Sequence, residues 1–198
     1  MTTIRDVHVG AVWLGAPSAA ALAELVAEQR RKPLAYPSAG MVRAPVPPTG
    51  FRRDERTREL GVGRPVFEAV VAGLRSWDVH RLAGLEVAGD PEVAPGAVVA
   101  SVLRFPVGSV VATCRVLAVD VAHDRWAFTY GTLPHHPERG EELFEVRIDA
   151  DGQVVARIVA CWHPAGVIGW LGSPIARRVQ PRVTERYFDA MAHLASRS

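Results

Sequence analysis

Several features that would point to common functions are scarce or missing in this sequence. Only Cys114 and Cys161 are cysteines among 198 residues, so a disulfide scaffold is excluded. No uninterrupted apolar run reaches the roughly 18 residues of a transmembrane helix, and we expect no membrane partner. Lys32 is the single lysine, the arginines form no basic block, and the net charge is only +2. Because a nucleic-acid-binding motif is also missing, we expect no nucleic-acid partner.

What the chain does contain is typical of a globular protein. Hydrophobic residues make up 48% and charged residues 22%, which is close to the globular average. The length suits a single domain over residues 1–198. Residues 7–23 are apolar and rich in small side chains, as in a signal peptide, but Asp6 and His8 interrupt their start and a helical pattern follows from Ser18. We therefore expect a cytoplasmic protein.

The first part of the chain favours a strand and two short amphipathic helices. Residues 4–14 are strand-like, and Ser18 is a good N-cap for a helix over about residues 19–31. A second helix begins near Pro65, and its apolar stripe ends at Trp77.

Between these helices we expect an irregular connection and a charged strand. Residues 34–50 are rich in proline and glycine, and Tyr36, Met41 and Val42 are available to dock this connection on the domain. Residues 51–60 are highly charged, which suits an edge strand with a solvated face.

After Trp77 the pattern changes to a series of strands and then to a final helix. The strand-like runs are residues 82–87, 97–105, 109–121, 126–133, 141–149 and 154–163. Their short connections make neighbouring strands antiparallel, with a longer loop at residues 134–140 as the exception. The apolar stripe of a long C-terminal helix consists of Val179, Val183, Tyr187, Met191 and Leu194. Pro181 either starts or kinks this helix.

The order of these segments predicts an α+β fold in which a curved antiparallel sheet of about six to seven strands wraps around the long C-terminal helix. Two shorter helices precede the main run of strands. This is the helix-grip plan, which leaves a cavity between the sheet and the helix. Helix-grip domains commonly hold apolar ligands there, which is an analogy at the level of the fold alone.

Four segments resemble a known protein family. The most distinctive is residues 130–144, YGTLPHHPERGEELF, which resembles the hallmark of DUF1990, also called UPF0548, a domain of unknown function found in bacteria and plants. The other matches are Leu34-Ala35-Tyr36-Pro37 with Gly50-Phe51, Gly61-Val62-Gly63 with Phe67, Ala69, Leu74 and Trp77, and Trp162-His163-Pro164-Ala165. The family more often has Ser or Arg in place of His163. The resemblance implies a compact α+β domain and names no activity.

Strand parity points to a pair of chemically active side chains. In residues 141–149 the apolar face carries Glu142, so this carboxyl should point inward above apolar residues. Tyr130 lies on the inward face of the preceding strand and should meet Glu142 across the hairpin. A carboxyl in an apolar pocket has a raised pKa and can act as a general acid, with the phenol as its partner. Alternatively, Glu142 satisfies the backbone of the 134–140 loop or pairs with Arg139 or Arg104.

Further residues are expected to line a ligand cavity. They are Trp77, Trp126, Phe128, Thr132, His135, His136, Phe144, Trp162 and Tyr187. The aromatic members have an alternative role as ordinary core. The loop at residues 134–140 would gate the cavity, and the apolar segment at residues 168–172 would form a lid or contact a partner. The adjacent His135 and His136 point apart in an extended loop, so we expect neither a metal nor another cofactor.

These features favour a cofactor-independent enzyme acting on a small, apolar, oxygenated molecule. A cyclase or dehydratase for a polyketide-type hydroxy-ketone of secondary metabolism, forming for example a spiroketal or a cyclic ether, fits a paired carboxyl and phenol. One alternative is a binding protein for a lipid-like or other apolar ligand. Another is an interaction protein whose aromatic residues fill the core and leave no cavity. The oligomeric state stays open, with a homodimer among the alternatives.

Overall fold

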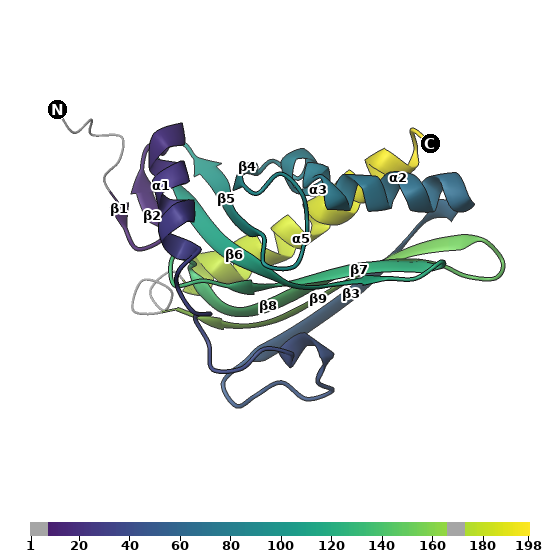
Figure 1. Cartoon of the computed structure of the whole chain (residues 1–198), viewed down its shortest axis with the longest axis horizontal. Helices are drawn as coiled ribbons and strands as arrows, with labels where there is room; N and C mark the ends of the chain where they lie inside the picture. The colour runs from purple at the N-terminus through teal and green to yellow at the C-terminus, as the bar shows by residue number, and fades with distance from the viewer. Residues whose placement is uncertain (1–7, 166–172) are drawn as a thin grey trace.

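A strongly curved antiparallel sheet forms the body of the protein, as the computed structural model shows (Figure 1). The structure describes residues 8–165 and 182–198 with their side chains, and residues 173–181 by their backbone alone. The strands are β1 (His8–Val9), β2 (Val12–Leu14), β3 (Arg52–Val62), β4 (Glu86–Gly89), β5 (Val98–Phe105), β6 (Gly108–Val121), β7 (Arg125–Thr132), β8 (Glu138–Ile148) and β9 (Gln153–Pro164). Their order is β1-β2-β6-β7-β8-β9-β3, and β5 pairs with both β4 and β6.

The helices lie on the concave side and at one end of this sheet. They are α1 (Ala19–Gln29), α2 (Arg64–Arg75), α3 (Asp78–Leu82) and α5 (Ser173–Ala195), with a short 3-10 turn, η2 (Met41–Arg43). The long helix α5 crosses the concave side and packs against α2 and α3, whereas α1 contacts β4 and β5 at the opposite end (Figure 1). The predicted α+β helix-grip fold is therefore confirmed.

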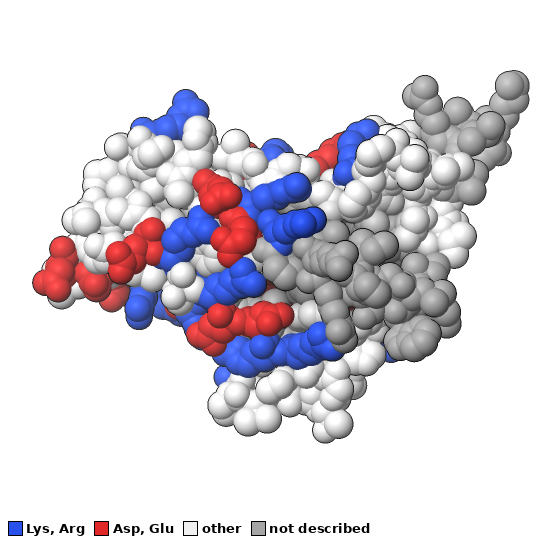
Figure 2. All heavy atoms as spheres, turned by 180° about the vertical axis from the view of Figure 1, so that it is seen from behind, with Lys and Arg blue, Asp and Glu red and all other residues white. Residues whose placement is uncertain are grey.

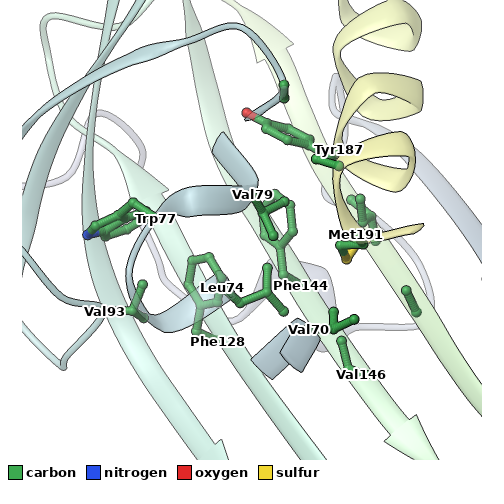
Figure 3. Packing of buried hydrophobic residues seen from close by; sticks show 14 of the residues in the cluster. Val70, Leu74, Trp77, Val79, Val93, Phe128, Phe144, Val146, Tyr187 and Met191 are labelled. Carbon is green, nitrogen blue, oxygen red and sulfur yellow. The ribbon is translucent and has the colours of Figure 1, made fainter. Parts of the chain in front are cut away.

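The main core fills the space between the concave face of the sheet and the helices α2, α3 and α5. Phe128 and Phe144 are directly opposite on β7 and β8, and their rings stack with centroids 5.1 Å apart. Tyr187 and Met191 reach this cluster from α5, and Leu74 reaches it from α2 (Figure 3). The period-2 pattern of these strands thus buries one face under the helices, as expected.

The charged strand β3 is an edge strand, as the sequence predicts, and it also holds α5 in place. The side chains of Arg56 and Arg58 are on the face of β3 that is turned to the helix, and their guanidinium groups each contact the Glu185 carboxylate at 2.5 Å. Arg58 also contacts Asp189 at 2.7 Å. These partly exposed ion pairs fix the position of the helix on the sheet edge more than they add to stability.

The outer, convex face of the sheet carries a row of cross-strand ion pairs. The row runs through Arg53, Glu55, Arg157, Glu145, Arg125, Asp120 and Arg43, which come from five strands and η2. Positive and negative side chains also alternate on the face seen in Figure 2, with no large area of a single sign.

The irregular connection before β3 docks on the convex face, as the sequence predicts. Tyr36, Met41 and Val42 are buried there against β7, β8 and β9. Both cysteines are free and buried. No helix in the described parts of the chain is both long and apolar enough to cross a membrane.

Three local predictions are wrong. The expected strand over residues 4–14 is, from residue 8 onward, the hairpin β1–β2, which turns at Gly10 with a left-handed φ of 55°. The strand expected over residues 82–87 begins only at Glu86, and residues 78–82 form the unpredicted helix α3, where Trp77 with a φ of 64° redirects the chain after α2. Strand β8 begins at Glu138 and takes up the second half of the expected loop.

Candidate functional site

A cavity of about 1210 Å³ opens between the concave face of the sheet, the β1–β2 hairpin and α5. The described residues that line it are mostly apolar and come from β1, β2, β5, β6, β7, β8, β9 and α5. A site of this volume is large enough for a sizeable organic ligand. A core completely filled by aromatic residues therefore does not describe this protein.

Tyr130 and Glu142 meet at the wall of this cavity. The two residues are directly opposite in the β7–β8 register, and both line the cavity. The Tyr130 hydroxyl donates a hydrogen bond of 2.6 Å to the Glu142 carboxylate. The strand alternation that places Phe144 in the core also points Glu142 to the same concave face.

The surroundings of Glu142 favour its protonated form. Burial raises the pKa of Glu142 to about 7, and the hydrogen bond from Tyr130 offsets part of this rise. The carboxyl is half-buried, and Tyr130 is its one hydrogen-bond donor among the described residues. Glu142 is therefore divided between its acid and base forms near neutral pH.

The expected structural roles of Glu142 are filled by other groups. Arg104 pairs with Glu86, and Arg139 is exposed on the opposite parity of β8. In the segment that was expected to be a loop, the backbone N–H of Gly140 donates to the Thr132 hydroxyl at 2.9 Å. Glu142 thus serves neither the loop nor an arginine in the described structure.

Glu138 is a second carboxyl at the cavity, and the sequence reasoning did not give it a role. It lies four residues before Glu142 on β8, so both side chains share the concave face. Burial raises the pKa of Glu138 to about 8, and the negative charges of Glu142 and Asp54 add to this rise. Alternation along β8 could have placed Glu138 on the same face as Glu142. It was not applied to Glu138 because residues 134–140 are expected to form a loop.

Tyr187 contributes a second phenol from α5. It lines the cavity, and burial followed by the charge of Glu142 raises its pKa. Its ring lies 4.9 Å from that of His80, which is 1% exposed. Burial lowers the pKa of His80 to about 3, and neither of its ring nitrogens has a partner among the described residues. His80 is therefore a neutral part of the aromatic core beside the site.

The two adjacent histidines have different surroundings and different hydrogen-bond partners. His136 lines the cavity, and its Nδ1 accepts a hydrogen bond of 2.9 Å from the backbone N–H of Glu138. Burial lowers the pKa of His136 to about 4. His135 lies outside the cavity lining, where its Nε2 accepts a 3.2 Å hydrogen bond from the Trp13 indole. It fastens the β1–β2 hairpin to the loop before β8.

Of the other residues expected to contact a ligand, some line the cavity and the rest lie in the core. Thr132 and Trp162 line the cavity together with Tyr187 and His136. Four of the expected aromatic residues are outside the described lining and pack in the core beside it: Trp77, Trp126, Phe128 and Phe144. Strand parity gives the face of a side chain but not how far along the strand the cavity extends, so it could not separate these two groups.

Trp13 is a lining residue that the sequence did not single out. It lies on β2 in the β1–β2 hairpin, and it is only 3% exposed. Its position depends on the pairing of β2 with β6, a long-range contact without a local sequence signal. The expected lid at residues 168–172 lies outside the described residues. In the described chain no three His, Cys, Asp or Glu side chains are grouped to hold a metal ion.

Comparisons with known proteins agree with this architecture. A crystal structure of a hypothetical protein from Helicobacter pylori is 11% identical and superposes with a TM-score of 0.56, covering 81% of this chain and 99% of that one. This likeness shows the fold alone. A Thalictrum norcoclaurine synthase, solved with a transition-state analogue, is 14% identical over 74% of this chain and 95% of its own, with a TM-score of only 0.48.

The sequence itself places the protein in a family. A UPF0548 protein of Deinococcus radiodurans is 30% identical over 178 residues, which cover 84% of this chain and 86% of that protein. The family model for a domain of unknown function, DUF1990, matches residues 35–190. That match includes the strands β3 to β9 and most of α5, and so the part of the cavity wall with Tyr130, Glu138 and Glu142, but not β1 and β2. The chain therefore belongs to the DUF1990 (UPF0548) family.

Proposed function

We propose that this protein is a cofactor-independent enzyme that performs acid–base chemistry on an apolar, oxygenated small molecule. The observation that carries this proposal is the Glu142 carboxyl, which faces a cavity of about 1210 Å³ and has Tyr130 as its single described donor. Removing a carboxyl and a phenol from water costs free energy where hydrogen bonds within the protein do not replace those to water. A ligand with oxygen atoms would supply the missing hydrogen-bond partners.

The pair suits the dehydrative cyclisation of a hydroxy-ketone. Ionised Glu142 takes the proton from a substrate hydroxyl as its oxygen forms a bond to the carbonyl carbon. The carboxyl passes that proton to the former carbonyl oxygen, which gives the hemiketal. Glu142 that has taken up a proton from solvent then protonates the hemiketal hydroxyl, whose C–O bond breaks to release water and leave an oxocarbenium ion. A second substrate hydroxyl completes a spiroketal, or loss of a neighbouring proton gives an unsaturated cyclic ether, and ionised Glu142 accepts the proton that is lost in this last step. One water leaves, and no oxidation or reduction takes place.

The phenols have a separate task in this scheme. The Tyr130 hydroxyl donates to Glu142 at 2.6 Å, so it can stabilise the ionised carboxylate. When Glu142 is protonated, the same hydroxyl can donate to the substrate carbonyl oxygen instead. Burial raises the pKa of both Tyr130 and Tyr187, which keeps the two hydroxyls protonated as hydrogen-bond donors. The apolar walls provide contact area for the carbon skeleton of the substrate.

A binding protein for a lipid-like ligand is the second candidate. The size of the cavity and its mostly apolar lining favour this alternative, since such a pocket retains apolar molecules without any chemistry. The two candidates differ in one observable, namely whether the ligand leaves the cavity chemically unchanged.

Native mass spectrometry after exposure to linear hydroxy-ketones and fatty acids separates the candidates. We expect a bound or released product that is lighter than the input by one water. Glu142→Gln should abolish this product and Tyr130→Phe should slow its formation, while Glu59→Gln, an exposed glutamate on β3, should behave like the natural protein. A bound mass equal to the input would identify a binding protein. Turnover that survives in both Glu142→Gln and Tyr130→Phe would rule out this mechanism.

A further inference from the structure

The concave face of β8 carries an interrupted row of side chains at the cavity wall. Glu138, Gly140 and Glu142 share this face, and all three line the cavity. Glycine places no side chain between two carboxyl-bearing residues whose Cα atoms are roughly 13 Å apart along the strand. Both side chains are long enough to reach toward the cavity side of Gly140.

The gap at Gly140 is imposed by the backbone. Its φ of 151° is rare for residues that carry a side chain. A Cβ atom at this position would lie 1.9 Å from the carbonyl oxygen of Cys161, which belongs to the neighbouring strand and cannot move aside. No side chain can therefore stand between the two carboxyls at this position.

An aromatic side chain lies beside this gap. Trp162 on β9 is directly opposite Gly140 and lines the cavity. Its indole N–H donates to Asp54 at 2.9 Å, which fixes the orientation of the ring. The guanidinium of Arg52 lies 5.5 Å from the ring centre, so this indole already interacts with one cation.

The Glu138 carboxyl has no side-chain partner within the described structure. Among the described residues, no side chain donates a hydrogen bond to the Glu138 carboxyl or pairs with it. Arg139 is the one described arginine in the lining, but it lies on the opposite parity of β8 and is exposed. The carboxyls of Glu142 and Asp54 are close enough to Glu138 to disfavour its ionisation. A cationic ligand group would relieve this repulsion.

We infer that the ligand of this cavity is an apolar amine whose ammonium group seats at Gly140, with Glu138 as its counter-ion and the Trp162 ring beside it. This inference rests on the proposed function and names a substrate class for it, an amine that also carries the hydroxyl and carbonyl oxygens. Glu138 holds the charge, which leaves Glu142 and Tyr130 for proton transfer. The same arrangement repels anionic ligands such as fatty acids.

Three probes that share one chain and differ in their head group test this inference. Decylamine, decanol and decanoate are titrated separately into the protein near pH 7, and binding is followed by calorimetry. We expect the amine to bind about tenfold or more tightly than the alcohol, and the carboxylate to bind most weakly. In Glu138→Gln the amine should fall to the affinity of the alcohol while the alcohol is unchanged. Glu59→Gln is the control and should retain the full preference.

Each outcome decides between the alternatives. Equal affinity of amine and alcohol for the natural protein would overturn the inference, and so would a preference that persists in Glu138→Gln. If Glu138→Gln does not fold, the order of the three probes in the natural protein still decides. Tight binding of the alcohol without preference for the amine would leave the proposed acid–base function intact, since that function is tested by loss of water. Failure of all three probes to bind would overturn the inference, whereas the proposed function is decided by the loss of water from a hydroxy-ketone.

Discussion

Two consecutive glutamates on β8 each pair with a tyrosine, on opposite faces of the same sheet. Glu142 meets Tyr130 on the concave face at the cavity, with a hydrogen bond of 2.6 Å. Glu141 meets Tyr36 on the convex face, with a hydrogen bond of 3.0 Å. The residue types and the strand are the same, so any difference between the pairs comes from what surrounds them.

The number of hydrogen-bond donors separates the two pairs. The Glu141 carboxylate also accepts from the backbone N–H groups of Gly40 at 2.7 Å and Val42 at 3.2 Å. It is 3% exposed and anchors the connection before β3 to the sheet. Glu142 has Tyr130 alone among the described residues. A buried carboxylate with three donors is satisfied by the fold, whereas a carboxyl with one donor keeps its capacity for a ligand.

The largest expected difference between the pairs is in turnover. Replacing the acid–base group in Glu142→Gln should lower the rate by about a hundredfold or more while the protein stays folded. Glu141→Gln should leave the turnover of the folded protein within a few-fold of normal, because its carboxylate is bound by Tyr36, Gly40 and Val42 on the convex face. Initial rates with a hydroxy-ketone, measured beside circular dichroism, check both. Equal rate losses in the two variants would contradict the assignment of roles.

The second difference is in the free energy of unfolding. Glu141→Ala leaves the Tyr36 hydroxyl and two backbone N–H groups without their acceptor, and we expect a loss of about 3 kcal/mol. Urea denaturation measures this loss, and Glu59→Ala, at an exposed position, should cost less than about 0.5 kcal/mol. A cost for Glu141→Ala that matches the Glu59→Ala control would show that the anchor is unimportant.

A third difference is in the pH dependence of stability. The pKa of Glu142 is about 7 in the folded protein and close to 4.5 in an unfolded chain. The folded state therefore binds this proton more tightly, so stability is lost as pH rises from about 4.5 to 7 and is constant above. Glu142→Gln removes this contribution, and its stability relative to the natural protein should rise by about 3 kcal/mol across that window. Parallel curves for the two proteins would contradict the raised pKa.

The smallest effect concerns the close approach of Tyr36 to the sheet. A Cβ atom at Gly131 on β7 would lie 2.1 Å from the Tyr36 hydroxyl, so Gly131→Ala should displace the anchor of Glu141. In a Tyr36→Phe background the same substitution should cost about 1 kcal/mol less, because the clashing oxygen is gone. Unfolding of the four proteins in this double-mutant cycle gives the coupling energy. Strict additivity would show that the hydroxyl is not the limiting contact.

The two pairs also show how far sequence reasoning reaches. Tyr130 and Glu142 could be placed together because alternation along adjacent strands fixes which side chains share a face. The burial of Glu141 could not be predicted, since it depends on a connection about a hundred residues earlier that crosses the convex face. Glu138 was missed because the start of β8 follows a proline-rich loop, and strand boundaries are the least certain part of such a pattern.

The most direct test of the central claim is a titration of the Glu142 carboxyl by carbon-13 NMR, with Glu142→Gln used to assign the signal. The account predicts a midpoint near pH 7, because the carboxyl faces an apolar cavity with a single described donor. This value would make Glu142 available as both acid and base at neutral pH. A midpoint near 4.5 would mean that the carboxyl is as well solvated as in an unfolded chain, and it would contradict the assignment of Glu142 as the acid–base residue.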